Sequence, residues 1–274
     1  MGYSVMIRYP GRGVNMNKFF LFSFTLIFFF NACIADDYSF DELLIFANKG
    51  DKVAQFNLGL MYQLGQEVTK DEAKAVKWYI KSAEQGVAEA QYNLGVMYSR
   101  GEGLAKDGTE AEKWWIAAAN QGFSEAQFNL GILYYFGQGV AKDGPEAERW
   151  LIKAAEQDHM LAQIALGALY HDGTSNIPLN GTQAIKWLSK AAAQGSPIAQ
   201  ERLGKIYAKG IETNKNFIKA YTWLSMVKYQ SDEENESIES ALNYLRKNME
   251  DWHIEKARSL AAECWASDFQ ECEE

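Results

Sequence analysis

Proline is scarce in this sequence of 274 residues, where it occurs only four times. Because proline interrupts helices, this scarcity is compatible with a chain that is helical along most of its length. Histidine and cysteine are also rare, with three residues each. The histidines lie far apart, and the sequence has no Cys-x-x-Cys pair or Cys/His cluster, so we predict no metal site.

Motifs of common enzyme classes are missing as well. The sequence contains no His-Glu-x-x-His, no Gly-x-Ser-x-Gly and no glycine-rich phosphate loop. Ser225–Lys228 matches the Ser-x-x-Lys motif of serine β-lactamases, but the Ser-Asp-Asn and Lys-Thr-Gly partner motifs do not occur. We therefore interpret Ser225 and Lys228 as exposed residues on a helix, and we predict a protein that is not an enzyme and holds no cofactor.

Basic residues are outnumbered. The chain has 27 basic and 36 acidic residues, and three of the bases but none of the acids precede Asp36. From residue 36 onward the net charge is therefore −12. This excess argues against nucleic acid or an anionic membrane surface as a partner, and it leaves a cationic partner open. The acidic run 231–237 is typical of a solvated linker.

The only long apolar run is Phe19–Phe30. Its twelve residues are too few to span a bilayer and are typical of a secretory signal peptide. Small residues at Cys33 and Ala35 predict cleavage after Ala35, so we expect a secreted or periplasmic protein. Met16 is a candidate start, with residues 1–15 as an upstream extension. Two alternatives stay open, an uncleaved membrane anchor and a lipid attached to Cys33.

The sequence does have a strong internal repeat. A Leu-Gly pair recurs five times, at steps of 36, 36, 36 and 37 residues, with glycines at Gly59, Gly95, Gly131, Gly167 and Gly204. A tryptophan column has the same spacing: Trp78, Trp114, Trp150, Trp187 and Trp223. Five copies of the same columns indicate a repeat architecture.

Each copy predicts a helical hairpin. Alanine, leucine, glycine and tyrosine positions of the first half share one helix face, as Ala54, Leu58, Gly59 and Tyr62 show in copy one. Glycine is unfavourable in the middle of a helix, so close approach of the second helix is the simple reason for it. The tryptophans are interpreted as core. Stacked hairpins predict an all-α, right-handed superhelical solenoid.

The predicted domain organisation follows from these columns. A signal peptide (1–35) precedes a capping helix (36–50) and five copies at about 51–86, 87–122, 123–158, 159–195 and 196–230. An acidic linker (231–236), two capping helices within 237–266 and a tail (267–274) complete the chain. Cys264 and Cys272 either pair across the end of the last helix or remain free thiols.

The repeat resembles a known family. The stretch "AQYNLGVMYSRGEGLAKDGTEAEKWWIAAANQGFSEA" (90–126) is similar to the Sel-one-like repeat, a relative of the tetratricopeptide repeat. The resemblance covers about residues 41–226. It departs from the pattern in copy one, where Glu67 replaces the second loop glycine, and in copy four, whose loop is one residue longer.

The resemblance implies a scaffold that binds proteins or peptides. Secreted bacterial members are associated with host-cell entry, envelope assembly and signalling. Cysteine-rich members are described as penicillin binders with weak β-lactamase activity, and they carry a disulfide in each repeat. The five copies here have no cysteine, so that subgroup is not supported, and such an enzyme is kept only as the alternative function.

Tetratricopeptide geometry, transferred by analogy, predicts a binding site on the concave side, which the first helices line. The apolar floor would include Phe56, Tyr92 and Phe128, with Tyr135, Phe136 and His171 on its lip. The alternative is that the column of Phe56 is simply core. Recurring glutamines and asparagines beside these residues either bind a peptide backbone or satisfy nearby carbonyl groups.

Overall fold

The computed structural model describes residues 39–173, 176–210, 214–230, 235–267 and 269. These residues form thirteen α-helices, and this part of the chain contains no β-strand. From Phe40 onward the chain is one compact unit. None of the described helices is both long and apolar enough to cross a membrane. The predicted signal peptide and Cys272 lie outside the described residues.

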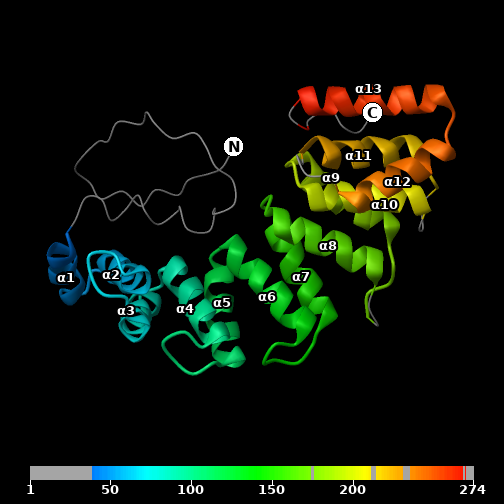
Figure 1. Cartoon of the computed structure of the whole chain (residues 1–274). Helices are drawn as coiled ribbons and strands as arrows, with labels where there is room; N and C mark the ends of the chain where they lie inside the picture. Colours follow the sequence, from blue (N-terminus) through cyan, green and yellow to red (C-terminus); the bar gives the residue numbers. More distant parts are fainter. Residues whose placement is uncertain (1–38, 174–175, 211–213, 231–234, 268, 270–274) are drawn as a thin grey trace. The chain divides into compact units, whose positions relative to one another are not determined.

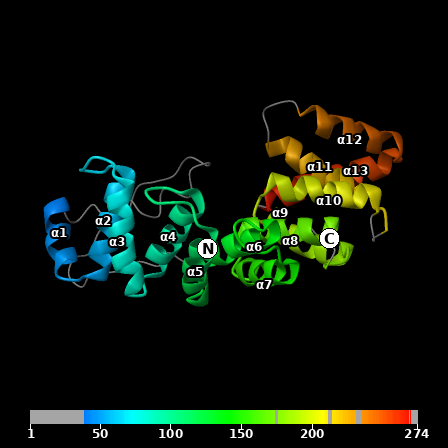
Figure 2. The same ribbon diagram turned by 90° about the horizontal axis from the view of Figure 1, so that it is seen from below.

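Ten of the helices form five antiparallel hairpins, one for each copy of the repeat. They pair α2 (Lys52–Leu64) with α3 (Glu72–Glu84), α4 (Ala88–Arg100) with α5 (Gly108–Asn120), α6 (Ser124–Phe136) with α7 (Gly144–Ala155), α8 (Met160–Asp172) with α9 (Gly181–Ala193), and α10 (Pro197–Lys209) with α11 (Phe217–Gln230). In the first four hairpins the second helix also packs against the first helix of the next hairpin, as Figures 1 and 2 show. The predicted all-α solenoid of hairpins is confirmed.

Three further helices cover the ends of this array. At the start, α1 (Phe40–Asn48) packs on α2. At the other end, α12 (Glu236–Lys247) and α13 (Asp251–Ala266) both pack on α11. They bury apolar side chains of α11 that would otherwise face solvent, and residues 220–227 of this helix are all buried.

The repeat glycines lie where the two helices of a hairpin touch. A Cβ atom added at any of the five would lie 2.4–2.6 Å from a side chain of the second helix. The side chains in contact are the residues that follow the tryptophan column, namely Tyr79, Trp115, Leu151, Leu188 and Leu224. Such distances leave no room for alanine, so close approach explains glycine at this position.

The tryptophan column flanks this contact. Trp150, Trp187 and Trp223 are 3–4% exposed, whereas Trp78 and Trp114 are only partly buried. Basic side chains cover several of the indole rings, for example Lys81 at 4.1 Å from the ring centre of Trp78. The column is therefore core in the last three copies, and in the first two it is shielded partly by cations.

In copies two and three, the loop within the hairpin packs against the hairpin before it. A Cβ atom at Gly103 would lie 2.5 Å from the carbonyl oxygen of Glu72, and Gly139 makes the same kind of contact one copy later. In copy one, Glu67 stands at this position with φ 56°. No full hairpin precedes copy one, and the Glu67 carboxylate instead accepts a hydrogen bond from the Phe40 N–H at the start of α1 (3.0 Å).

Candidate partner-binding face

Four first helices carry half-buried or exposed side chains on one side, which together we call the first-helix face. Side chains three or four positions apart share one side of a helix, as Leu161, Ile164 and Ala168 do. The face consists of Tyr92 and Val96 on α4; Phe128, Ile132, Tyr135 and Phe136 on α6; Leu161, Ile164, Ala168 and His171 on α8; and Ile198, Glu201, Arg202, Lys205 and Lys209 on α10. All of them are half-buried or exposed.

Phe56 does not belong to this face, contrary to the sequence prediction. Its side chain is only 4% exposed. The ring packs in the core beside Tyr79, with 5.8 Å between ring centres, and in the same cluster as Val76 and Val87. The residue of this column is therefore core in copy one, whereas Tyr92 and Phe128 in the same column are half-buried.

Tyr92 and Phe128 are half-buried because each ring packs against the next copy. The ring centre of Tyr92 lies 5.1 Å from that of Phe123, and Phe128 stacks on His159 at 4.9 Å. Phe123 and His159 are the residues that immediately precede α6 and α8. These two aromatic residues thus join consecutive copies and offer only part of their surface to a partner.

The pair Tyr135–Phe136 lies at the end of α6, as predicted. Phe136 is 59% exposed, whereas Tyr135 is half-buried against the neighbouring core cluster. Their rings meet edge to face, with 4.9 Å between centres, and the Lys142 ammonium lies 5.4 Å from the Tyr135 ring. Tyr135 therefore supports Phe136, which is the accessible member of the pair.

His171 lies at the equivalent end of α8. Its side chain is 26% exposed, and its Nδ1 atom lies 2.8 Å from the Asp172 carboxylate. Two apolar residues on the face were missed by sequence reasoning: Leu161 is 49% exposed and Ile198 is 56% exposed. The sequence did contain a signal for them: copies two and three carry glutamate at this position, whereas copies four and five carry an apolar residue.

His159 caps α8 as well as stacking on Phe128. Its Nδ1 atom accepts a hydrogen bond from the Ala162 N–H at 3.2 Å, which requires an unprotonated ring nitrogen. Burial lowers the pKa of His159 below its usual 6.5, and the nearby Glu125 carboxylate opposes this effect more weakly. The neutral imidazole is therefore part of the structure beside the face.

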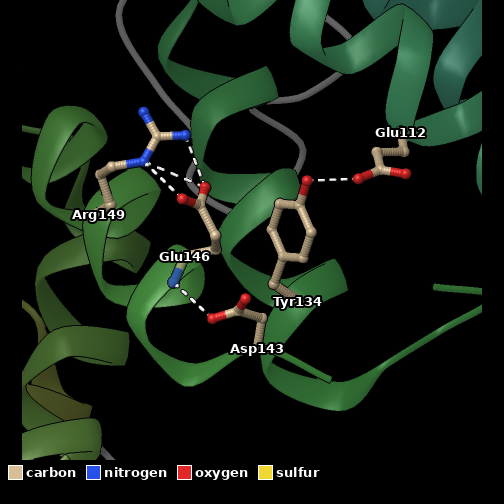
Figure 3. A network of polar contacts seen from close by, with 5 residues as sticks. All are labelled: Glu112, Tyr134, Asp143, Glu146 and Arg149. Carbon is tan, nitrogen blue, oxygen red and sulfur yellow. Dashed lines mark hydrogen bonds and ion pairs between the residues drawn. The ribbon is translucent and has the colours of Figure 1, made fainter. Parts of the chain in front are cut away.

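Polar contacts behind the face link successive hairpins (Figure 3). The Tyr134 hydroxyl on α6 donates to the Glu112 carboxylate on α5. Tyr170 makes the same contact with Glu148 one copy later. Burial, with the carboxylate next to it, raises the pKa of Tyr134. These hydroxyls therefore stay protonated, and the geometry assigns them to the joints between copies.

Asp143 and Glu146 complete this network at the start of α7. The Asp143 carboxylate accepts a hydrogen bond from the Glu146 N–H at 3.0 Å, which caps the helix. The Glu146 side chain pairs with Arg149 at 2.6 Å. Equivalent capping bonds come from the residues Asp71, Asp107, Asn180 and Asn216.

The recurring glutamines are occupied by the protein itself. In each copy one glutamine amide donates to a carbonyl at the end of the preceding helix, and its oxygen accepts from a second glutamine about thirty positions later. The donating residues are Gln55, Gln91, Gln127, Gln163 and Gln200. Of the two interpretations that the sequence left open, carbonyl satisfaction is the correct one for these glutamines.

The Ser-x-x-Lys motif does not form an exposed pair. Ser225 is 5% exposed in α11, so its interpretation as a surface residue was wrong: α13 packs on this helix. Lys228 is exposed and pairs with Glu239 of α12.

Cys264 is fully buried and disulfide-bonded, and because Cys272 lies outside the described residues, their pairing stays a prediction.

Comparisons with known proteins agree with this geometry. A family model described as Sel1 repeat matches residues 52–87, 88–123, 124–159, 161–196 and 197–226. The solved structure of a protective antigen present in uropathogenic Escherichia coli strains, displaying an SLR fold, is 33% identical with a TM-score of 0.71. That match covers 84% of this chain and 50% of that one.

Two further relatives are similar. A Sel1 repeat protein from Oxalobacter formigenes has 32% identity and a TM-score of 0.60, over 76% of this chain and 58% of that one. A sel1-like repeat-containing protein of Acanthamoeba polyphaga mimivirus is 44% identical over 45 residues, 16% of this chain and 8% of the relative. The chain spans less than two thirds of each of these relatives. With five matched repeats that cover most of its length, the chain belongs to the Sel1 repeat family, whose helical repeats generally act as protein-interaction scaffolds.

Proposed function

We propose that this protein is a non-enzymatic scaffold that binds a segment of a partner protein on its first-helix face. The observation that carries the proposal is the exposure of large apolar side chains in three consecutive copies. Phe136, Leu161 and Ile198 are 49–59% exposed, all on the same side of their helices. Large exposed apolar side chains that recur in three consecutive copies are a feature of surfaces that bind a partner.

The rest of the hairpin array is built to keep this face rigid. The glutamine ladder, the Tyr134–Glu112 contact and the Phe128–His159 stack all connect one copy to the next. A surface that is ordered before binding loses little conformational entropy when a partner arrives. Recognition by shape and by side chains that differ between copies is the mechanism that this arrangement supports.

The cellular setting is part of the proposal. The predicted signal peptide supports a secreted or periplasmic protein, acting in host interaction or envelope assembly. One solved relative is a protective antigen of uropathogenic Escherichia coli, and we extend that host-facing setting to this chain. By analogy with tetratricopeptide repeats, the first-helix face would line the concave side of the solenoid.

Affinity capture from an envelope extract tests the binding surface. The bait is the chain from residue 36 to 274, compared with a Tyr135→Ala/Phe136→Ala variant. Tyr244→Ala is the matched control, because this ring on α12 is 55% exposed and lies off the face. We expect the double variant alone to lose partners while it keeps its helical content. Unchanged capture by a folded double variant would rule out this surface.

A nitrocefin assay tests the non-enzymatic part of the proposal. The buried position of Ser225 supports an absence of hydrolysis by the purified chain. Hydrolysis that disappears in a folded Ser225→Ala variant would establish the enzyme alternative instead.

A further inference from the structure

The first-helix face changes its chemistry between copies four and five. On α6 and α8 the residues three positions before and one position after the repeat glycine are apolar, as Phe128, Ile132 and Ile164 show. On α10 these two columns carry Glu201 and Lys205, and Lys209 stands in the column of Phe136. In the two columns beside the glycine, the side chains of this face are therefore apolar on α6 and α8 and charged on α10.

Copy five is basic in a chain that is otherwise acidic. Residues 196–230 hold six basic and two acidic residues, although the whole chain has a net charge of −9. On the face itself Glu201 pairs with Lys205, with 2.5 Å between Nζ and Oε1. Within the described residues, neither Arg202 nor Lys209 forms an ion pair. Arg202 is half-buried and Lys209 is exposed, so two cations on α10 lack a counter-charge beside the apolar surface.

We propose that the partner segment carries apolar side chains followed by Asp or Glu side chains. This inference rests on the proposed function of the face. The apolar part would lie on α6 and α8, against Phe136 and Leu161, and the carboxylates would lie on α10, against Arg202 and Lys209. Guanidinium and ammonium groups are complementary to carboxylates, and pairs near an apolar contact are partly desolvated.

The charge of the remaining molecule sharpens this selectivity. Residues 231–274 hold thirteen acidic and four basic residues, so an acidic segment is disfavoured near the C-terminal helices. The attraction at α10 acts over about one Debye length, roughly 8 Å at physiological salt. The apolar contacts therefore supply the affinity, and the cations determine which segments bind and in which direction.

Selection from a displayed library of short random peptides tests the inference. The targets are the chain 36–274 and an Arg202→Glu/Lys209→Glu variant. Lys247→Glu/Lys256→Glu is the matched control: it makes the same change in net charge at two exposed positions on α12 and α13. Circular dichroism shows whether each variant is folded. The readout is the enrichment of each residue type over the input library.

The expected result is enrichment of apolar residues together with Asp and Glu for the wild type and the control. The Arg202→Glu/Lys209→Glu variant should keep the apolar enrichment, lose the acidic one and bind a selected peptide roughly tenfold more weakly. Apolar peptides without acidic enrichment, or with basic enrichment, would overturn this inference and leave the proposed function standing. No enrichment by the wild type would contradict both.

Discussion

At the residue scale, the repeat glycines show how a single missing Cβ atom sets the distance between two helices. Gly131 faces the Leu151 side chain, and a Cβ atom there would lie 2.5 Å from Leu151 Cγ. Glycine costs a helix about 1 kcal/mol relative to alanine. Alanine at this position would nevertheless be worse, because the hairpin would have to open.

We expect Gly131→Ala to lower the free energy of unfolding by roughly 1–3 kcal/mol, the usual cost of overpacking. Urea unfolding followed by circular dichroism measures it. A Gly131→Ala/Leu151→Ala double variant is the control, because removing the opposing side chain should make the two effects less than additive. Strict additivity would show that the contact with Leu151 is not the cause.

His159 makes the stability of copy four depend on pH. Burial lowers its pKa in the folded chain below the usual 6.5. Protonation therefore favours the unfolded chain. The stabilising contribution is complete above about pH 6.5 and is lost as the pH falls through the lowered folded-state pKa.

A His159→Ser variant checks this prediction, because Ser196 caps α10 at the equivalent position. Between about pH 7 and pH 5, the wild type should lose more stability than the variant. The comparison uses the slope of the urea midpoint against pH, so a lower stability of the variant at every pH does not affect it. Equal slopes would mean that His159 does not titrate in this range.

At the element scale, the glutamine ladder fixes the turn between neighbouring helices. The Gln127 amide donates to the Ala119 carbonyl at 3.1 Å, and its oxygen accepts from the Gln157 amide at 2.7 Å. Gln127 is 4% exposed, whereas Gln157 lies at the surface. The buried Gln127 therefore binds the C-terminal end of α5 directly, whereas the exposed Gln157 binds only the Gln127 side chain.

Replacing the buried member should be costly. We expect Gln127→Leu to lower the free energy of unfolding by about 1–2 kcal/mol, because the buried hydrogen bond to the Ala119 carbonyl is lost while this carbonyl keeps the Gly122 N–H as a donor, at 3.0 Å. Gln157→Ala, which removes only the outer link, should cost less than about 1 kcal/mol. Thermal unfolding of the two variants measures the difference. Equal losses would show that the ladder acts as one unit.

Local features of the hairpins could be predicted from the sequence because they recur. The mid-helix glycines, the capping residues and the tryptophan spacing each have a reason within one hairpin and its neighbour. Phe56 could not be assigned in the same way, since its burial depends on its setting in copy one rather than on its column. Leu161 and Ile198 could not be found from the columns near the glycine, because the change from glutamate to an apolar residue lies one helical turn earlier.

At the scale of the whole molecule, the C-terminal helices close the array. Tyr221, Leu224 and Val227 of α11 are 1–7% exposed. They pack in one cluster with Leu242 of α12 and Ala257 of α13. In the interior of the array, the second helix of a hairpin is covered by the next hairpin. At the end of the array, α12 and α13 cover α11 instead.

A chain that ends at Gln230 should therefore expose this apolar surface and self-associate. We expect high-molecular-weight species in size-exclusion chromatography and a lower unfolding temperature than that of the full chain. The control is a chain that keeps α12 and α13 and ends at Ser267. A monomeric truncated chain with an unchanged unfolding temperature would show that these helices are not needed to close the array.

Site-specific photo-crosslinking tests most directly whether the first-helix face binds the partner. A photoreactive residue replaces Phe136 in one protein and Tyr244, of similar exposure, in another. Each protein is irradiated in the envelope extract and the adducts are compared. We expect a discrete adduct from position 136 and none from position 244. Equal adducts at both positions, or an adduct from position 244 alone, would contradict a binding surface on the first helices.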